Sequence, residues 1–301
     1  MAHKITNFYL LFFALFALVI SPAPPLADAA ETAAAPLRIV SLYAGHTDNI
    51  IALGAGDRLV AASGGDESEF STRLPPNVRR LPIKTGVEAV LALKPDVVIL
   101  RSLVAQVNPH LPEALKRSGV SVYIIDPPSW DGFEDYLILL AGILGTDPDE
   151  AREKLGNLRA RIAQNAVEAA YNKAKPRVFL EATKELHTCA PGSWAARLIE
   201  LAGGLNAASE AVPLRMGSPL ALWGVERVLE IANSNSSGLD VYLVQQGPMN
   251  GVTLDEVRAR PWFVALNVRL SAAPESCLSR PSLLGLEAGG RMLIEIFYGE
   301  K

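Results

Sequence analysis

The sequence predicts an α/β protein with two Rossmann-like α/β lobes, joined by one long backbone helix, and a ligand cleft between the lobes. Short hydrophobic strands alternate with helical segments, a pattern typical of parallel sheets covered by helices. One long helical segment, 147–175, separates two such series. On each side of it, Gly-Val-Glu is followed by a helix, an Asp and a strand, in 86–100 and in 224–244, which indicates similar lobes.

The N-terminus has the pattern of a secretory signal peptide. Lys4 precedes an apolar run of about 13 residues, 8–20, which is shorter than the roughly 20 residues that a membrane-spanning helix needs. Ala27 and Ala29 provide the small residues of a cleavage site. We therefore predict a signal peptide over 1–29, cleavage after Ala29 and a periplasmic location. An uncleaved anchor is the alternative.

The first lobe is expected over 37–146. Its strands are the apolar segments 37–42, 59–62, 97–100 and 120–125. A turn over 43–47 is expected to precede a short helix that ends at Leu53, and further helices are expected from Glu88, over 109–118 and over 133–144. The polar segment 63–85, which contains two adjacent prolines, is expected to be a loop.

The backbone helix is expected over 147–175. Asp147 can accept hydrogen bonds from the first turn, and Pro148 fits the first helical position. Lys173 and Lys175 lie near the negative end of the helix dipole, and Pro176 ends the helix. Such a helix spans roughly 40 Å, so we expect a stiff connection that limits the movement of the lobes.

The second lobe is expected over 176–301 and repeats the alternation of the first. Strands are expected over 177–180, 241–244 and 264–270. Helices are expected over 194–201, from Glu226, over 254–259 and over 282–298.

Composition narrows the class of protein. The chain has 301 residues, 50% of them hydrophobic, which is enough for two modest cores. The net charge is −4 and no block of Lys and Arg occurs, so nucleic acid is not an expected partner.

The chain has two cysteines, Cys189 and Cys277. In an oxidising compartment they could form a disulfide, which we predict; two buried thiols are the alternative.

Ligands of open parallel sheets bind beyond the carboxyl ends of the strands, so the loops there should hold the binding residues. Large aromatic side chains suit an organic ligand stacked in a cleft, and arginines can pair with its anionic groups. The candidate ligand-binding residues are Tyr43, His46, Arg101, Trp130, His187, Trp194, Trp223, Gln245 and Arg280.

No catalytic motif is present in the sequence. It lacks GxSxG, HExxH and a Gly-rich phosphate loop, so we predict no enzyme activity and no cofactor. An α/β-cleft enzyme stays an alternative that would require a base and a nucleophile across the loops. A second alternative is direct binding of Zn or Mn by His46, His110 and His187.

The motifs together resemble the periplasmic substrate-binding proteins of ABC importers for iron–siderophore, haem and vitamin B12. The resemblance covers nearly the whole chain after the leader, from 38–63 through 86–100, 111–126, 190–208 and 223–232. It implies that Glu88 and Glu226 form salt bridges with arginines of a dimeric permease. It also implies small lobe movements. Asp48 departs from the family, which usually has Glu there, and the 63–85 loop lacks a Tyr-Pro pair.

We therefore predict a monomeric periplasmic solute-binding component of an ABC importer. Its ligand is expected to be a metal chelate, either an iron(III)–siderophore or a corrinoid, held in the interlobe cleft. Its expected partners are the permease dimer and the associated ATPase subunits. The loop residues do not decide between the chelates.

Overall fold

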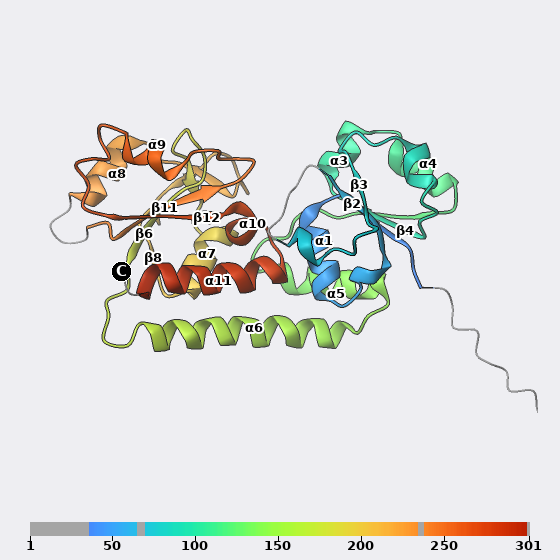
Figure 1. Ribbon diagram of the computed structural model, residues 1–301, viewed down its shortest axis with the longest axis horizontal. Helices are drawn as coiled ribbons and strands as arrows, with labels where there is room; N and C mark the ends of the chain where they lie inside the picture. Colours follow the sequence, from blue (N-terminus) through green and yellow to red (C-terminus); the bar gives the residue numbers. More distant parts are fainter. Residues whose placement is uncertain (1–35, 65–69, 234–237, 300–301) are drawn as a thin grey trace, which may run out of the picture. The chain divides into compact units, whose positions relative to one another are not determined.

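The computed structural model describes residues 36–64, 70–233 and 238–299. The predicted signal peptide and its cleavage site after Ala29 lie outside these residues. The contacts group Pro36–Lys301 into one compact unit. We call β1–α5 its N-terminal half and β6–α11 its C-terminal half; Figure 1 shows the elements of both.

A five-stranded parallel sheet forms the centre of the N-terminal half. Its order is β3-β2-β1-β4-β5. The strands are β1 (Ile39–Ser41), β2 (Leu59–Ser63), β3 (Arg79–Leu81), β4 (Val97–Leu100) and β5 (Ser121–Ile124). The helices are α1 (Ala44–Ala52), α2 (Val87–Leu91), α3 (Ser102–Val107), α4 (Leu111–Arg117) and α5 (Phe133–Leu144). Four of these strands confirm the sequence prediction. Strand β3 lies in the segment that was predicted to be a loop. It was missed because two of its three residues, Arg79 and Arg80, are charged and exposed, so the segment lacks an apolar run.

The backbone helix α6 (Pro148–Ala169) begins as predicted, with Asp147 accepting a hydrogen bond from the amide of Asp149. It ends six residues earlier than predicted, because the chain turns at Asn172, whose φ is +57°. Lys173 instead donates to the carbonyl of Tyr298, the last residue of α11 (Leu283–Tyr298), at 2.7 Å. Helices α6 and α11 pack alongside each other (Figure 1).

A four-stranded parallel sheet, β12-β11-β6-β8, forms the centre of the C-terminal half. Its strands are β6 (Arg177–Glu181), β8 (Leu205–Asn206), β11 (Val241–Gln246) and β12 (Arg269–Pro274). The helices are α7 (Trp194–Leu201), α8 (Val225–Ala232), α9 (Leu254–Arg258) and α10 (Glu275–Leu278). The predicted last strand, 264–270, is wrong: the extended segment starts at Arg269, where pairing with Val241 begins.

A small antiparallel sheet, β7-β10-β9, was not predicted. It consists of β7 (Thr188–Cys189), β10 (Leu220–Leu222) and β9 (Val212–Pro213). Strands of two or three residues leave too few positions for an alternating pattern to appear in the sequence.

The predicted disulfide is wrong. Cys189 and Cys277 are both buried, and they are not joined to each other. Cys189 lies in β7 within the main hydrophobic core, whereas Cys277 lies in α10 beside Phe70 and Leu284. The two cysteines therefore belong to separate apolar clusters, and burial raises the pKa of the Cys189 thiol to about 12.

Two sets of contacts join the halves. Asn49 of α1 donates to the carbonyl of Pro281 at 3.1 Å and accepts from the amide of Leu283 at 2.9 Å. We call these two bonds the Asn49 clip. The indole of Trp130 lies 4.9 Å, centre to centre, from that of Trp194. Both junctions are buried or partly buried, which fits a stiff arrangement of the halves.

Candidate functional site

A hollow of about 600 Å³ lies at the carboxyl ends of strands β1 to β4. This is the edge at which parallel sheets bind ligands. We call it the N-terminal hollow. Its lining residues are Leu42, Tyr43, Ser63, Gly64, Arg80, Pro82, Ile83, Arg101, Leu103 and Val104.

Two of the predicted ligand-binding residues, Tyr43 and Arg101, come together in this hollow. The guanidinium carbon of Arg101 lies 5.1 Å from the centre of the Tyr43 ring, a cation–π distance. Both side chains are partly exposed. Arg101 precedes helix α3, whose first amide, that of Ser102, donates to Asp126 at 2.9 Å. The local backbone therefore fixes the direction from which Arg101 enters the hollow.

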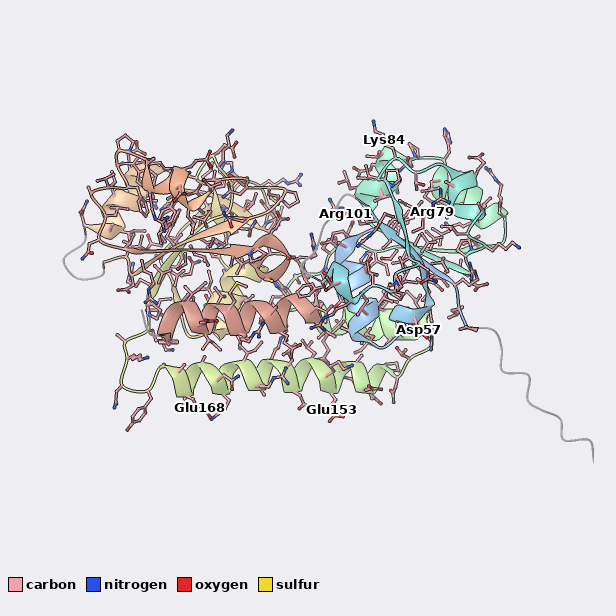
Figure 2. All side chains as sticks on the ribbon, viewed as in Figure 1. Asp57, Arg79, Lys84, Arg101, Glu153 and Glu168 are labelled. Atoms are coloured by element: carbon pink, nitrogen blue, oxygen red, sulfur yellow. The ribbon has the colours of Figure 1, made fainter. Side chains whose placement is uncertain are left out.

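The described lining is basic as well as apolar. Arg80, which the sequence interpretation missed, donates to the carbonyl of Ser63 at 3.2 Å. Lys84 lies in the segment that follows β3, outside the lining, and Figure 2 shows Lys84 and Arg101 in this half, with Arg79 nearby. No carboxylate occurs among the lining residues that the structure describes. Three acidic residues, Asp66, Glu67 and Glu69, follow Gly64 in the sequence and lie outside the described segments.

His46 was predicted to lie in a turn facing ligand, but it lies in helix α1 and is 1% exposed. Its Nε2 is 2.9 Å from the carbonyl of Ile125 and its Nδ1 is 2.8 Å from the hydroxyl of Tyr136. Because a carbonyl can only accept, Nε2 carries the proton and the Tyr136 hydroxyl donates to Nδ1. His46 is thus a neutral core residue.

This burial should make stability depend on pH. Desolvation lowers the pKa of His46 to about 4, against about 6.5 in the unfolded chain. The folded state favours the neutral imidazole, so the contribution of His46 to the free energy of unfolding is complete above pH 6.5 and decreases as the pH falls toward 4. The free energy of unfolding should fall by about 3 kcal/mol over this range. Urea unfolding at pH 7 and pH 4.5 should show it in the parent protein.

His46→Gln should remove most of that pH dependence, whereas His110→Gln, which changes an exposed histidine, should keep it. Equal pH dependence in the parent and His46→Gln would refute the role of His46.

Two predicted ligand-binding tryptophans instead form a junction. Trp194, at the start of α7, is 5% exposed and packs against Phe133 at 4.8 Å between ring centres. Trp130, partly buried, lies under the guanidinium of Arg159 at 4.5 Å, and Arg159 donates to its carbonyl at 2.9 Å. The expectation that these indoles lie in open loops is wrong for Trp194, because the N-terminus of α7 packs into the core.

Gln245 and Arg280 are also buried, at 0% and 6% exposure. Gln245 accepts a hydrogen bond from the hydroxyl of Ser279. Arg280 lies 3.8 Å from the carboxylate of Asp48, so it balances a buried charge. These contacts give both residues a structural role in the described conformation.

The two remaining predicted residues lie in the C-terminal half. The Nδ1 of His187 is 3.1 Å from the hydroxyl of Thr183, in the turn between β6 and β7. Trp223 is partly buried with the guanidinium of Arg227 at 5.0 Å from its ring. The three histidines of the metal-ion alternative lie in different elements, and the described residues contain no group of three side chains suited to a metal ion.

Glu88 and Glu226 occupy matching positions. Each is exposed and lies in the first turn of a helix, α2 or α8, that begins after a Gly. Exposure at this position leaves both carboxylates open to a partner.

A buried polar network was missed by the sequence interpretation. Glu181, at the carboxyl end of β6, is 0% exposed and accepts from both Nη atoms of Arg260 at 2.7 and 2.8 Å. The hydroxyl of Tyr242 donates to it at 2.6 Å, and Asn250 donates to its main-chain carbonyl at 3.3 Å. Arg260 lies about 80 residues away in sequence, so only the fold reveals the pairing.

Comparison with known proteins identifies the family to which this chain belongs. The model of the periplasmic binding protein family matches residues 39–229. The chain belongs to that family. Vitamin B12-binding proteins of Photorhabdus laumondii and Yersinia pestis are each 28% identical to it, over 179 and 172 residues. These matches cover 58% and 56% of the chain and 62% and 59% of the relatives, so the chain spans about three fifths of their length.

Solved structures of periplasmic binding proteins share the two-lobed fold. The periplasmic heme-binding protein RhuT from Roseiflexus sp. RS-1 superposes with a TM-score of 0.61 at 22% identity, covering 87% of this chain and 99% of its own. The vitamin B12-binding protein BtuF of Vibrio cholerae superposes with a TM-score of 0.54 at 23% identity, covering 86% and 95%. At these identities the likeness concerns the fold.

Within the described part of the chain, none of the helices is both long and apolar enough to cross a bilayer.

Proposed function

We propose that this periplasmic binding protein captures an organic metal chelate and delivers it to an ABC importer. The observation that carries the proposal is the N-terminal hollow, which combines an aromatic ring, aliphatic side chains and two arginines at the ligand edge of the sheet. The named relatives bind vitamin B12 or heme, which are metal chelates of this general kind. Export to the periplasm, action as a monomer and the absence of catalysis are parts of the same proposal.

Delivery would use the two exposed glutamates. Glu88 and Glu226 present carboxylates from equivalent helix starts, a pair that suits a dimeric partner with one basic site in each subunit. The partner would be the permease dimer, and its ATPase subunits would supply the energy. The permease interaction is tested separately from ligand binding, as described in the Discussion.

Arg101→Ala should weaken chelate binding by about tenfold or more, because a hydrogen bond to a charged group contributes roughly 1.5–3 kcal/mol. The measurement is titration calorimetry of the full chain with cyanocobalamin, iron protoporphyrin IX and a ferric siderophore, together with visible absorption of the complex. Arg79→Ala is the matched control. Arg79 is an exposed residue of β3 that directly precedes Arg80, and it does not line the hollow.

Equal affinity of Arg101→Ala and the parent for every chelate that binds would remove the hollow from the proposed site. If the parent bound none of the chelates but bound free Zn or Mn, the transport of a metal ion would replace the proposal.

A further inference from the structure

One buried ion pair joins the two halves. Asp48 lies in α1 of the N-terminal half, and Arg280 lies between α10 and α11 of the C-terminal half (Figure 1). Their side chains are 3% and 6% exposed, and the Nη1 atom of Arg280 lies 3.8 Å from Oδ2 of Asp48. A hydrogen bond between these atoms would need about 2.7–3.2 Å. In the described part of the chain, this buried Nη1 atom has no hydrogen-bond partner. The guanidinium is therefore incompletely compensated for the loss of water.

A second buried ion pair of the chain is complete. It lies within the C-terminal half, where the Glu181 carboxylate accepts from both Nη atoms of Arg260 at 2.7 and 2.8 Å and from the Tyr242 hydroxyl at 2.6 Å. These three hydrogen bonds compensate for the burial of both charges. The pair between the halves has no hydrogen bond of this kind between its members, because its charged atoms are 3.8 Å apart. The contact across the halves is therefore the weaker of the two pairs.

The backbone around Arg280 fixes this distance. On one side, the hydroxyl of Ser279 donates to the side-chain oxygen of Gln245. On the other side, the carbonyl of Pro281 accepts from Asn49 at 3.1 Å, which is one bond of the Asn49 clip. Arg280 is thus held between two anchored neighbours, so its segment cannot move toward the carboxylate on α1 without breaking one of these bonds. The same anchoring places the ion pair and the clip at one junction.

We propose that the pair of Asp48 and Arg280 is a breakable latch, whose strength sets how often α1 separates from the segment before α11. Separation admits water, which hydrates both charges and recovers part of the solvation lost on burial. The two bonds of the Asn49 clip open in the same step, because they join the chain segments that carry the pair. The halves thus have a junction that opens locally while their own sheets stay intact. This inference goes beyond the proposed function and does not depend on the identity of the ligand.

Hydrogen exchange of single amides, measured by NMR on the full chain without ligand, tests the latch. The amide of Leu283 donates across the junction to the side chain of Asn49 at 2.9 Å. The amide of Leu286 donates to the carbonyl of Ser282 at 2.8 Å, inside the C-terminal half. Both leucines are buried, at 3% and 0% exposure. Opening of the junction therefore exposes only the first amide to exchange, whereas global unfolding exposes both.

Asp48→Asn keeps the shape of the side chain and removes its charge. It should speed exchange of the Leu283 amide by at least about tenfold, because Arg280 is left buried without its counter-charge. The exchange of the Leu286 amide should not change. Arg280→Met should have a similar effect on Leu283. The two substitutions together should return the exchange close to that of the parent, because neither buried charge remains.

Glu287→Gln is the control. Glu287 lies in α11 and pairs with Arg161 of α6 at 2.5 Å, but these side chains are 50% and 58% exposed, so the variant should exchange like the parent. Unchanged exchange of Leu283 in Asp48→Asn would overturn the latch. Equal acceleration of Leu283 and Leu286 would overturn it too, because the pair would then stabilise the whole fold. So would a double variant that exchanges as fast as the single variants, because packing rather than charge would hold the junction.

Discussion

Replacing both Glu88 and Glu226 with Ala should abolish stimulation of the permease and leave chelate affinity nearly unchanged. The reason is geometric: both carboxylates are exposed in the first turns of α2 and α8, and neither lines the N-terminal hollow. Truncating one partner of a desolvated charge pair at an interface costs about 2–5 kcal/mol, so losing two such pairs would remove productive docking. The measurement is ATP hydrolysis and chelate uptake by the reconstituted importer.

Matched controls are available in the same halves. Glu230→Ala changes an exposed glutamate of α8 further along that helix, and Glu113→Ala changes an exposed glutamate of α4. Both variants should stimulate the permease like the parent protein. If the double variant at Glu88 and Glu226 also supported normal uptake, the docking role of the two residues would be wrong.

Glu181→Ala should lower the free energy of unfolding by about 3 kcal/mol, because breaking a buried ion pair leaves the other charge uncompensated. Glu181 is completely buried, and the side chain of Arg260 is only 19% exposed. The variant also removes the acceptor of the Tyr242 hydroxyl, a hydrogen bond of 2.6 Å in the core. Urea unfolding at pH 7 measures the loss.

Asp255→Ala is the control for Glu181→Ala. Asp255 forms an ion pair of the same kind with Arg258, but the two side chains are 91% and 58% exposed, so little change in stability is expected. Because Asn250 donates to the main-chain carbonyl of Glu181, the side-chain change leaves that bond in place. A loss no larger than that of the control would show that Arg260 relaxes into solvent without penalty.

The sequence predicted helices best where the helical repeat of apolar residues extends over several turns. Helix α6 began at its capping residue, Asp147, and α7 and α11 were predicted within a residue of their bounds. These segments carry enough turns for the apolar stripe to be clear, and their caps are side chains that the sequence shows. Strands β3 and β9 could not be predicted, because two or three residues without a longer apolar run leave no pattern in the sequence and their backbone bonds depend on pairing with another strand.

The candidate site was only partly predictable. Tyr43 and Arg101 follow strands of one parallel sheet, so the rule for carboxyl ends was enough to select them. The same rule selected Trp194 and Gln245, which the structure buries. Gln245 lies within β11, which runs two residues beyond the predicted strand end at Val244, and Trp194 starts α7, whose N-terminus packs into the core. His46 was misplaced because α1 starts earlier than predicted, at Ala44.

The Asn49 clip constrains the order in which the molecule can form. It closes a loop of more than 230 residues, since Asn49 bonds to Pro281 and Leu283. Helix α11 also packs against both α1 and α6. The N-terminal half therefore cannot complete its own interior until nearly the last segment of the chain has been made. Assembly should be governed by contacts of high sequence separation, which form slowly, rather than by independent folding of each half. A newly made chain would thus stay incompletely folded until its synthesis is nearly finished.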